Sequence, residues 1–184
     1  SDEVVVIHIS NFRPVKRIDD TVAAFAIAAK DRKMRLLLVG DGPEMGQTRR
    51  RAKELGIDDK VIFAGKQEHV AQLLAISDIH VLLSEKEAFG LVVLEAMAIG
   101  VPSVVSTAGG LPEVIQDGVT GYIVPTYDVK VAAARIGELA DDPLLRERMA
   151  EEGIRDTRRR FDSNEIVRRY EQVYERVCAR HELA

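Results

Sequence analysis

The sequence has little of what marks several large classes of protein. Its single cysteine, Cys178, excludes an internal disulfide and a metal site built from cysteines. It contains no signal peptide and no apolar run long enough to span a membrane, so we expect a cytoplasmic chain without a membrane span. Its net charge of −4 argues against nucleic acid as a partner, because nucleic-acid-binding domains usually present a basic patch.

The patterns of several catalytic sites are missing as well. The spacing of the four histidines fits neither a metal site nor a Ser-His-Asp triad, and we predict no bound metal. His8 and His80 fall within apolar segments and are expected to be core residues. The first apolar segment is not followed by G-x-G-x-x-G, which a nicotinamide-dependent oxidoreductase needs there. The basic clusters at 49–51 and 158–160 have acidic neighbours and are interpreted as solvated helix faces.

What the sequence does contain is an alternation of strand-like and helix-like segments. The strand-like segments are apolar runs typical of strands buried on both faces, at residues 4–10, 34–40, 61–65, 78–84, 101–106 and 120–124. Helix-like segments lie between them, at residues 18–30, 43–55, 70–76, 91–99, 111–116 and 129–140. We therefore predict one α/β domain of Rossmann-like, three-layer αβα architecture, with a parallel sheet of about six strands.

The tail, residues 142–184, differs from the rest of the chain. It is charged, helical in period and without a strand-like segment, and Phe161-Asp162-Ser163 divides it into two helices. Apolar residues recur on one face of the second helix, at Ile166, Tyr170, Val173, Tyr174 and Val177. We therefore expect C-terminal helices after the α/β domain.

Residues 84–95 carry the strongest functional signal. They read S-E-K-E-A-F-G-L-V-V-L-E and place Glu87 and Glu95 eight residues apart, between an expected strand and an expected helix. The free N–H groups at the start of that helix can hold phosphate. Carboxylates cannot bind phosphate, but they can accept hydrogen bonds from sugar hydroxyls. The arrangement therefore suits a nucleotide sugar, which contains a sugar, a diphosphate and a second sugar.

Two carboxylates could also belong to a glycosidase. That chemistry requires a short, fixed separation of the carboxyl groups, which this sequence does not set. No third acidic residue nearby is organised for proton transfer, so separate binding roles are favoured for Glu87 and Glu95. A local capping or pairing role for Glu95 is left open.

Other expected strand ends carry polar residues. Three cations follow the first strand: Arg13, Lys16 and Arg17. Facing a helix N-terminus they would clamp a diphosphate, although these residues taken alone favour a solvated turn around Pro14. Lys66 and Gln67 follow the third strand, where a nucleobase could lie. Residues 109–113, G-G-L-P-E, form a tight turn into a helix whose role could be purely structural.

Taken together, these motifs resemble the donor-binding half of the GT-B glycosyltransferases of family 4. The matching motifs are V-G-D-G-P-E at 39–44, E-x7-E with F-G-L inside it at 87–95, A-M-A-x-G-x-P at 96–102, G-G-L-P-E at 109–113 and D-G-V-T-G at 117–121. A narrower resemblance rests on residues 8–17, 65–67 and 82–87. It is to family members that move N-acetylglucosamine from its UDP donor to L-malate, with retention, in bacillithiol synthesis.

The resemblance implies roles for the charged residues. Lys16 would contact the donor phosphates, Glu87 would bind the hydroxyls of the donor sugar, and these two residues are the candidate catalytic pair. Glu95 would accept hydrogen bonds from the ribose hydroxyls. The family usually has arginine where this chain has Asn11, and Arg13 is the cation that could supply the charge instead.

The resemblance also assigns the remaining contacts of the donor. The backbone N–H groups of Phe89, Gly90 and Leu91 would bind sugar and diphosphate. Lys66 and Gln67 would border the base. The donor is a substrate, expected to be UDP-N-acetylglucosamine, and neither a cofactor nor a metal is implied.

The resemblance finally implies how the chain relates to a complete enzyme. Residues 1–184 would be the donor-binding C-terminal domain, with 142–184 as C-terminal helices, and the N-terminal domain that binds a small-molecule acceptor would be absent. The full-length protein would be a retaining transferase, and the isolated chain would be inactive. Two alternatives stay open: a family member with another sugar or acceptor, and a nucleotide-binding module without catalysis. The sequence also leaves a homo-oligomer open.

Overall fold

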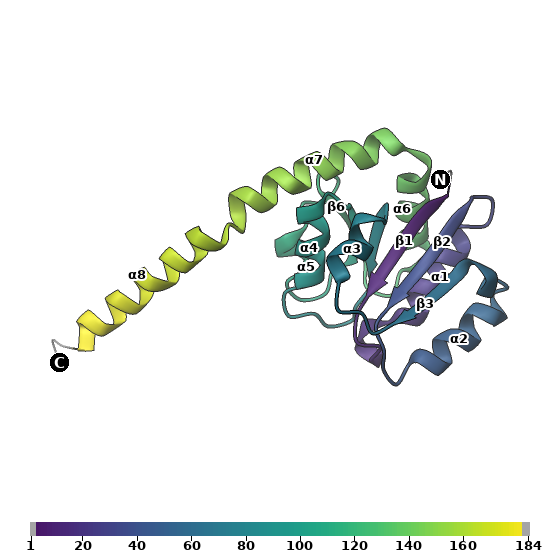
Figure 1. Ribbon diagram of the computed structural model, residues 1–184, viewed down its shortest axis with the longest axis horizontal. Helices are drawn as coiled ribbons and strands as arrows, with labels where there is room; N and C mark the ends of the chain where they lie inside the picture. The colour runs from purple at the N-terminus through teal and green to yellow at the C-terminus, as the bar shows by residue number, and fades with distance from the viewer. Residues whose placement is uncertain (1–2, 182–184) are drawn as a thin grey trace.

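The computed structural model describes residues 3–181 and contains a six-stranded parallel sheet with helices on both faces (Figure 1). The strands are β1 (Val4–Ile9), β2 (Met34–Val39), β3 (Val61–Gly65), β4 (Ile79–Leu82), β5 (Ser103–Ser106) and β6 (Gly121–Val124). Their spatial order is β3-β2-β1-β4-β5-β6, and every pairing is parallel. The predicted α/β class and strand number are confirmed.

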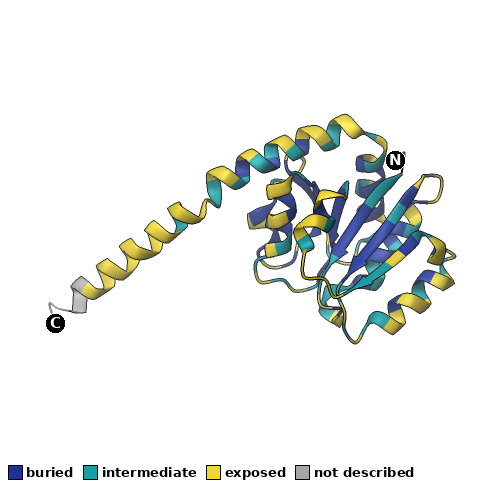
Figure 2. Ribbon diagram, viewed as in Figure 1, coloured by how far each residue is buried: buried dark blue, intermediate teal, exposed yellow. Residues whose placement is uncertain are grey.

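The helices form two layers around the sheet. They are α1 (Ile18–Ala28), α2 (Met45–Glu54), α3 (Val70–Ala75), α4 (Leu91–Ile99), α5 (Leu111–Val114), α6 (Val129–Asp141), α7 (Pro143–Arg160) and α8 (Ser163–His181), with short 3-10 turns at Pro14–Lys16 and Asp58–Lys60. One face of the sheet packs against α1, α2 and α6, and the other against α3, α4 and α5. Figure 2 shows the strands as the buried centre of this sandwich.

The central strand β1 shows why the strands are apolar throughout. Val6 packs into the cluster beneath α1, α2 and α6, whereas the next residue, Ile7, packs beneath α3 and α4. Both faces are covered, so a polar face is not needed. The order of strands along the chain reverses between β1 and β4, and their following loops diverge to opposite faces of the sheet. This divergence opens a crevice at the carboxyl ends of the strands.

The C-terminal helices follow the sandwich. The Asp142 side chain caps α7 by accepting from the Leu145 N–H at 2.9 Å, and α7 then contacts α6 and α4. Gly153 allows a close approach, because a Cβ there would lie 2.9 Å from Met97 Cγ. Beyond α7, α8 extends away from the domain (Figure 1). It is exposed along the part whose burial is described, except at the half-buried Ile166 (Figure 2).

The predicted apolar face of α8 is largely exposed, with Tyr170 62% and Tyr174 67% accessible.

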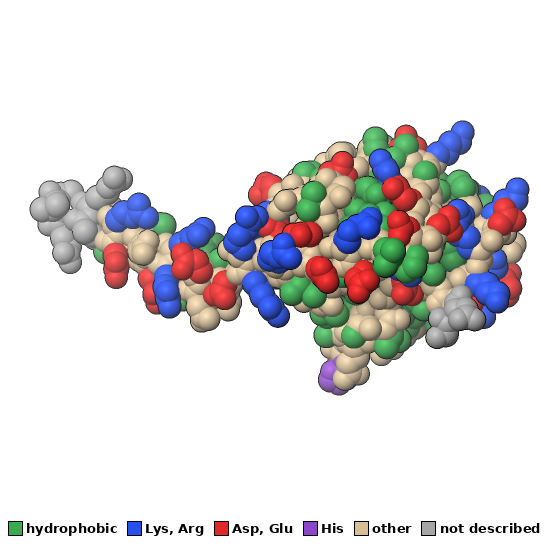
Figure 3. All heavy atoms as spheres, turned by 90° about the horizontal axis from the view of Figure 1, so that it is seen from above, with side chains coloured by type: hydrophobic (Ala, Val, Ile, Leu, Met, Phe, Trp, Pro, Cys, Tyr) green, Lys and Arg blue, Asp and Glu red, His purple; other side chains and the backbone are tan. Residues whose placement is uncertain are grey.

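The face of the molecule seen in Figure 3 carries acidic and basic side chains side by side rather than one basic patch. Within residues 3–181, no helix combines the length and apolar character needed to cross a membrane.

Candidate functional site

The loops that follow β1 and β4 meet where the strand order reverses. The backbone N–H of Glu85 donates to the carbonyl of Val15 at 2.8 Å, which joins the two loops directly. In parallel α/β sheets, ligands bind at such a point, outside the carboxyl ends of the strands. Predicted residues from both loops therefore lie where a ligand is expected.

An ion pair between Lys16 and Glu87 spans these loops. The Lys16 ammonium donates to Glu87 Oε2 at 2.6 Å, and the Ser84 hydroxyl donates to the same oxygen at 3.4 Å. Only 18% and 14% of the two charged side chains are exposed, so their attraction is screened less than at an open surface. The structure thus brings together the two residues that the sequence selected as the candidate catalytic pair.

The N-terminus of α4 lies beside this pair. Gly90 precedes the helix with a φ of +86°, a left-handed conformation that favours glycine. A Cβ at Gly90 would lie 3.7 Å from Glu87 Cγ and only 2.5 Å from Leu111 Cδ2. The first N–H groups of a helix have no intrahelical partner. The predicted anion-binding backbone at Phe89, Gly90 and Leu91 is therefore adjacent to Glu87.

The loop before α5 packs directly against the backbone of Glu87 and Ala88. A Cβ at Gly109 would lie 1.6 Å from the Glu87 carbonyl oxygen, and a Cβ at Gly110 would lie 2.6 Å from the Ala88 carbonyl oxygen. The Gly110 N–H also donates to the Glu87 carbonyl at 3.3 Å. Only glycine allows this close approach at both positions. The turn therefore contacts the backbone of the loop that carries Glu87, in addition to starting α5.

A hollow of about 490 Å³ lies at the ends of β1, β2 and β3. Three of the predicted residues line it: Asn11, Lys66 and Gln67. Gly40 is required beneath it, because a Cβ there would lie 1.8 Å from the Ser10 carbonyl oxygen. Gln67 Nε2 donates to the Ala64 carbonyl at 2.7 Å, which ties the loop after β3 to its strand. The hollow has the position predicted for the base.

A second hollow, of about 510 Å³, lies between α3 and α4. Glu95 lines it together with His69 and Gln72, and Val70 lines both this hollow and the previous one. No side chain among residues 3–181 forms a hydrogen bond or ion pair with the Glu95 carboxylate. The local capping role that the sequence left open for Glu95 is therefore not found.

Several residues differ from what the sequence predicted. Arg13 is exposed and makes no side-chain hydrogen bond in the described part of the chain, so its role as a replacement for arginine at position 11 stays a prediction. The sequence analysis gave no individual role to Ser84, His69 or Gln72. Ser84 has only a hydroxyl at the start of residues 84–95, and His69 and Gln72 lie at the start of the short helix α3, where no distinctive pattern marks them.

The interpretation of residues 158–160 as a solvated face is wrong in part. Arg159 and Arg160 pair with the buried carboxylate of Asp156. Arg160 also donates to the carbonyls of Glu113 and Val114. The contacts of Arg160 with α5 could not be predicted from a local pattern, because they join residues 46 and 47 positions apart in the sequence.

The two strand histidines are buried, as predicted. Because a carbonyl can only accept, His8 Nδ1 donates to Val81 at 3.0 Å, and the neutral ring then accepts from the Ser10 hydroxyl through Nε2 at 2.8 Å. Burial lowers the pKa of His8 to about 4 and that of His80 to about 3. His80 Nδ1 lies 3.1 Å from Ser103 Oγ, while its Nε2 has no partner among the described residues. Both rings are therefore neutral at pH 7.

A larger hollow, of about 900 Å³, lies elsewhere, between α1, α2 and the start of α6. Of the predicted site residues only Arg17 lines it, and its guanidinium is already paired there with Asp20 at 2.8 Å. The strand ends, where the other predicted residues lie, therefore form the better candidate site. Within residues 3–181, no cluster of three or more His, Cys, Asp or Glu side chains could hold a metal ion.

Comparison with known proteins identifies the family. Residues 1–156 match the sequence family described as Glycosyl transferases group 1. N-acetyl-alpha-D-glucosaminyl L-malate synthase of Bacillus anthracis is 49% identical over 172 residues, which cover 94% of this chain and 45% of that protein. The chain thus spans less than half the length of this relative.

Solved structures agree with the sequence match. Sucrose-phosphate synthase of Thermosynechococcus elongatus is 30% identical with a TM-score of 0.87, over 97% of this chain and 46% of that one. HepE of Anabaena, solved with UDP-glucose, is 27% identical with a TM-score of 0.84, over 97% of this chain and 49% of that one. The fold, the order of motifs and these matches together show that the chain belongs to the group 1 glycosyl transferases, with half of a GT-B architecture.

Proposed function

We propose that the chain is the donor-binding domain of a retaining glycosyltransferase that moves N-acetylglucosamine from UDP-N-acetylglucosamine to L-malate. The observation that carries this proposal is the contact of Lys16 with Glu87 beside the glycine-capped start of α4. A cation next to a helix N-terminus suits a diphosphate, and a carboxylate beside both suits sugar hydroxyls.

The donor would lie along the carboxyl ends of the strands. The base would enter the hollow lined by Asn11, Lys66 and Gln67, and the ribose would reach Glu95 in the adjoining hollow. The diphosphate would lie between Lys16 and the start of α4, and Glu87 would bind the transferred sugar. Val70 lines both hollows, so they are neighbours, and this supports the path.

In the proposed reaction, the bond between the anomeric carbon and the diphosphate oxygen breaks. A bond between that carbon and the malate hydroxyl oxygen forms on the same face of the sugar. The hydroxyl proton passes to the leaving diphosphate, so the chain needs no general base. Lys16, Arg13 and the N-terminus of α4 would stabilise the charge that develops on the diphosphate.

The acceptor is proposed from the relative in Bacillus anthracis, whose name states L-malate. The rest of the full-length protein would hold malate, because the matched region covers 45% of that relative. We place the reaction in the cytoplasm, which is compatible with an exposed free cysteine at position 178.

Calorimetry with UDP, UDP-N-acetylglucosamine, UDP-glucose and NAD tests the donor site. We expect UDP and UDP-N-acetylglucosamine to bind, UDP-glucose to bind more weakly than UDP-N-acetylglucosamine, and NAD not to bind. Preferred binding of NAD would contradict the proposal, and equal affinity for UDP-glucose and UDP-N-acetylglucosamine would remove the sugar assignment.

A fusion of this chain to the remaining N-terminal part of the Bacillus anthracis relative tests the acceptor. We expect the chain alone to release no product from UDP-N-acetylglucosamine and L-malate, because both reactants must be held in one cleft. The fusion should form N-acetylglucosaminyl malate. Product from the chain alone would overturn the domain assignment. Transfer by the fusion to another acceptor, and none to malate, would overturn the malate assignment. Nucleotide binding without transfer to any acceptor would favour a non-catalytic module.

A further inference from the structure

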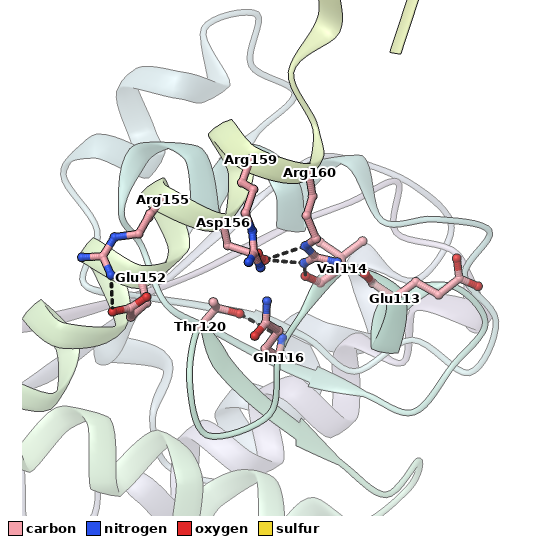
Figure 4. A network of polar contacts seen from close by, with 9 residues as sticks. All are labelled: Glu113, Val114, Gln116, Thr120, Glu152, Arg155, Asp156, Arg159 and Arg160. Carbon is pink, nitrogen blue, oxygen red and sulfur yellow. Dashed lines mark hydrogen bonds and ion pairs between the residues drawn. The ribbon is translucent and has the colours of Figure 1, made fainter. Parts of the chain in front are cut away.

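The C-terminal end of α7 holds α5 in place (Figure 4). The Arg160 guanidinium donates to the Glu113 carbonyl at 2.7 Å and to the Val114 carbonyl at 2.6 Å. These carbonyls end a four-residue helix that is too short to satisfy them itself. Arg160 therefore fixes the far end of α5, whose near end begins at Gly110 against the Glu87 backbone.

Asp156 holds Arg160 in this orientation. Its carboxylate, only 5% exposed, accepts from Arg160 Nε at 2.8 Å and from Arg159 at 2.9 Å. Figure 4 shows Asp156 pointing toward Arg160 beneath α7. A buried carboxylate needs its cations, since breaking a buried pair leaves an uncompensated charge. The position of the guanidinium is thus set from within α7.

Phe161, the next residue, reaches the donor loop, which we define as residues 87–90. Its ring centroid lies 5.9 Å from that of Phe89, in an edge-to-face arrangement at 72°. The Arg160 guanidinium lies 4.6 Å from the Phe161 ring centroid, which links the two contacts. The donor loop is therefore bounded by Phe161 on one side and by the loop before α5 on the other, and α7 holds both.

We propose that Arg160 and Phe161 are positioning residues for the donor loop and that they set the affinity for the sugar nucleotide. The proposal rests on the proposed function. The chain leaves the domain immediately after Phe161 and continues as α8. A displacement of α8 would therefore act first on the residue that contacts Phe89, and the exposed helix is coupled to the donor loop.

The test compares Phe161→Ala with Ile154→Ala. Ile154 lies on α7 and Phe161 directly follows it, and both pack against the α4 layer, but Ile154 lies near Gly100, at the end of α4 away from the donor loop. Two quantities are measured in the 184-residue chain. One is the affinity for UDP-N-acetylglucosamine by calorimetry. The other is hydrogen exchange, without ligand, of the Val93 and Leu94 amides, which donate to the Gly90 carbonyl at 2.9 and 3.3 Å.

We expect Phe161→Ala to weaken the binding of UDP-N-acetylglucosamine and to speed hydrogen exchange at these amides, each by about threefold to tenfold. This is the fold-change that corresponds to the energy of one aromatic pair. Ile154→Ala should lower the melting temperature with both quantities unchanged. Phe161→Tyr keeps the ring, so its affinity and exchange rates should equal those of the wild-type chain. Phe161→Leu keeps most of the volume without the ring and replaces the alanine variant in the test if that variant does not fold. Arg160→Ala should also speed exchange, whereas Arg158→Ala, exposed on the same turn, should not.

Equal effects of Phe161→Ala and Ile154→Ala would overturn the positioning role and indicate a general loss of stability. Unchanged affinity and exchange in Phe161→Ala, with normal binding by the wild-type chain, would overturn it while leaving the proposed function intact. If the wild-type chain bound no UDP-sugar, the proposed function would fail. The exchange measurement would then decide separately whether α7 holds the donor loop.

Discussion

The Lys16 ammonium and the Glu87 carboxylate, 71 residues apart in the sequence, meet at 2.6 Å between the loops after β1 and β4. The pair exists because β1 and β4 are neighbours in the sheet although three helices and two strands separate them along the chain. A diphosphate that binds Lys16 must share the ammonium with Glu87. In the proposed function, a sugar attached to that diphosphate would lie next to the carboxylate.

Replacing Lys16 should distinguish phosphate binding from base binding. We expect Lys16→Ala to weaken UDP binding by about 1.5–3 kcal/mol, the range for a hydrogen bond to a charged group. Uridine has no phosphate, so its affinity should change little. Calorimetry with both ligands measures the difference, and Lys53→Ala, an exposed lysine on α2, is the control. Equal losses for UDP and uridine would contradict the phosphate role.

Arg13 is tested in the same way. Arg13→Ala should also weaken UDP binding more than uridine binding if this side chain supplies the charge that Asn11 cannot. An unchanged UDP affinity would show that position 11 has no cationic substitute in this chain.

Glu87→Gln should act on the sugar and not on the nucleotide. The amide can still accept a hydrogen bond from Lys16 but no longer attracts its charge, so UDP affinity should be retained or raised. Affinity for UDP-N-acetylglucosamine should fall relative to UDP, and transfer by the fusion should drop sharply. Glu85→Gln, two residues earlier, is the control. A strong loss of UDP binding in Glu87→Gln would instead assign Glu87 to the ribose or phosphate.

Glu95 should act on the ribose. Its carboxylate is exposed and unpaired among the described residues. Glu95→Ala should therefore cost little stability while weakening UDP binding by about 1–3 kcal/mol. Calorimetry and a thermal melt give the two quantities, with Glu147→Ala on α7 as a charge-matched control. A folded Glu95→Ala variant with wild-type UDP affinity would end the ribose assignment.

His8 should make stability depend on pH. An unfolded imidazole titrates near 6.5, whereas burial lowers the pKa of His8 to about 4 in the folded chain. Between these values the unfolded chain binds a proton that the folded chain does not, so stability falls as the pH drops from 6.5 toward 4. The full loss from His8 would be of the order of 3 kcal/mol.

Urea unfolding at several pH values measures this dependence. His8→Gln should remove about half of the histidine contribution to this dependence, because His80, whose pKa burial lowers to about 3, supplies the other half. His69→Gln, at an exposed histidine, should leave the dependence unchanged. Nuclear magnetic resonance titration of the wild-type imidazoles gives an independent check. A His8 pKa near 6.5 in the folded chain would contradict the prediction.

The sequence determined the secondary structure and most of the candidate site. Apolar runs predict strands buried on both faces, and the six strands lie within two residues of their predicted ends. The glycines before and after α4 mark its ends because the left-handed conformations at Gly90 and Gly100 favour glycine whatever the tertiary context. These features are readable because periodicity and backbone preference act over a few neighbouring residues.

Only the tertiary structure decided which side chains meet. The Lys16–Glu87 pair, the close approach of Gly109 to Glu87, and the contact of Phe161 with Phe89 each join segments far apart in the sequence. They depend on strand order and on the crossing of α7 over α4, which no local pattern encodes. For the same reason Arg160 looked like part of a solvated face, although its guanidinium binds the end of α5.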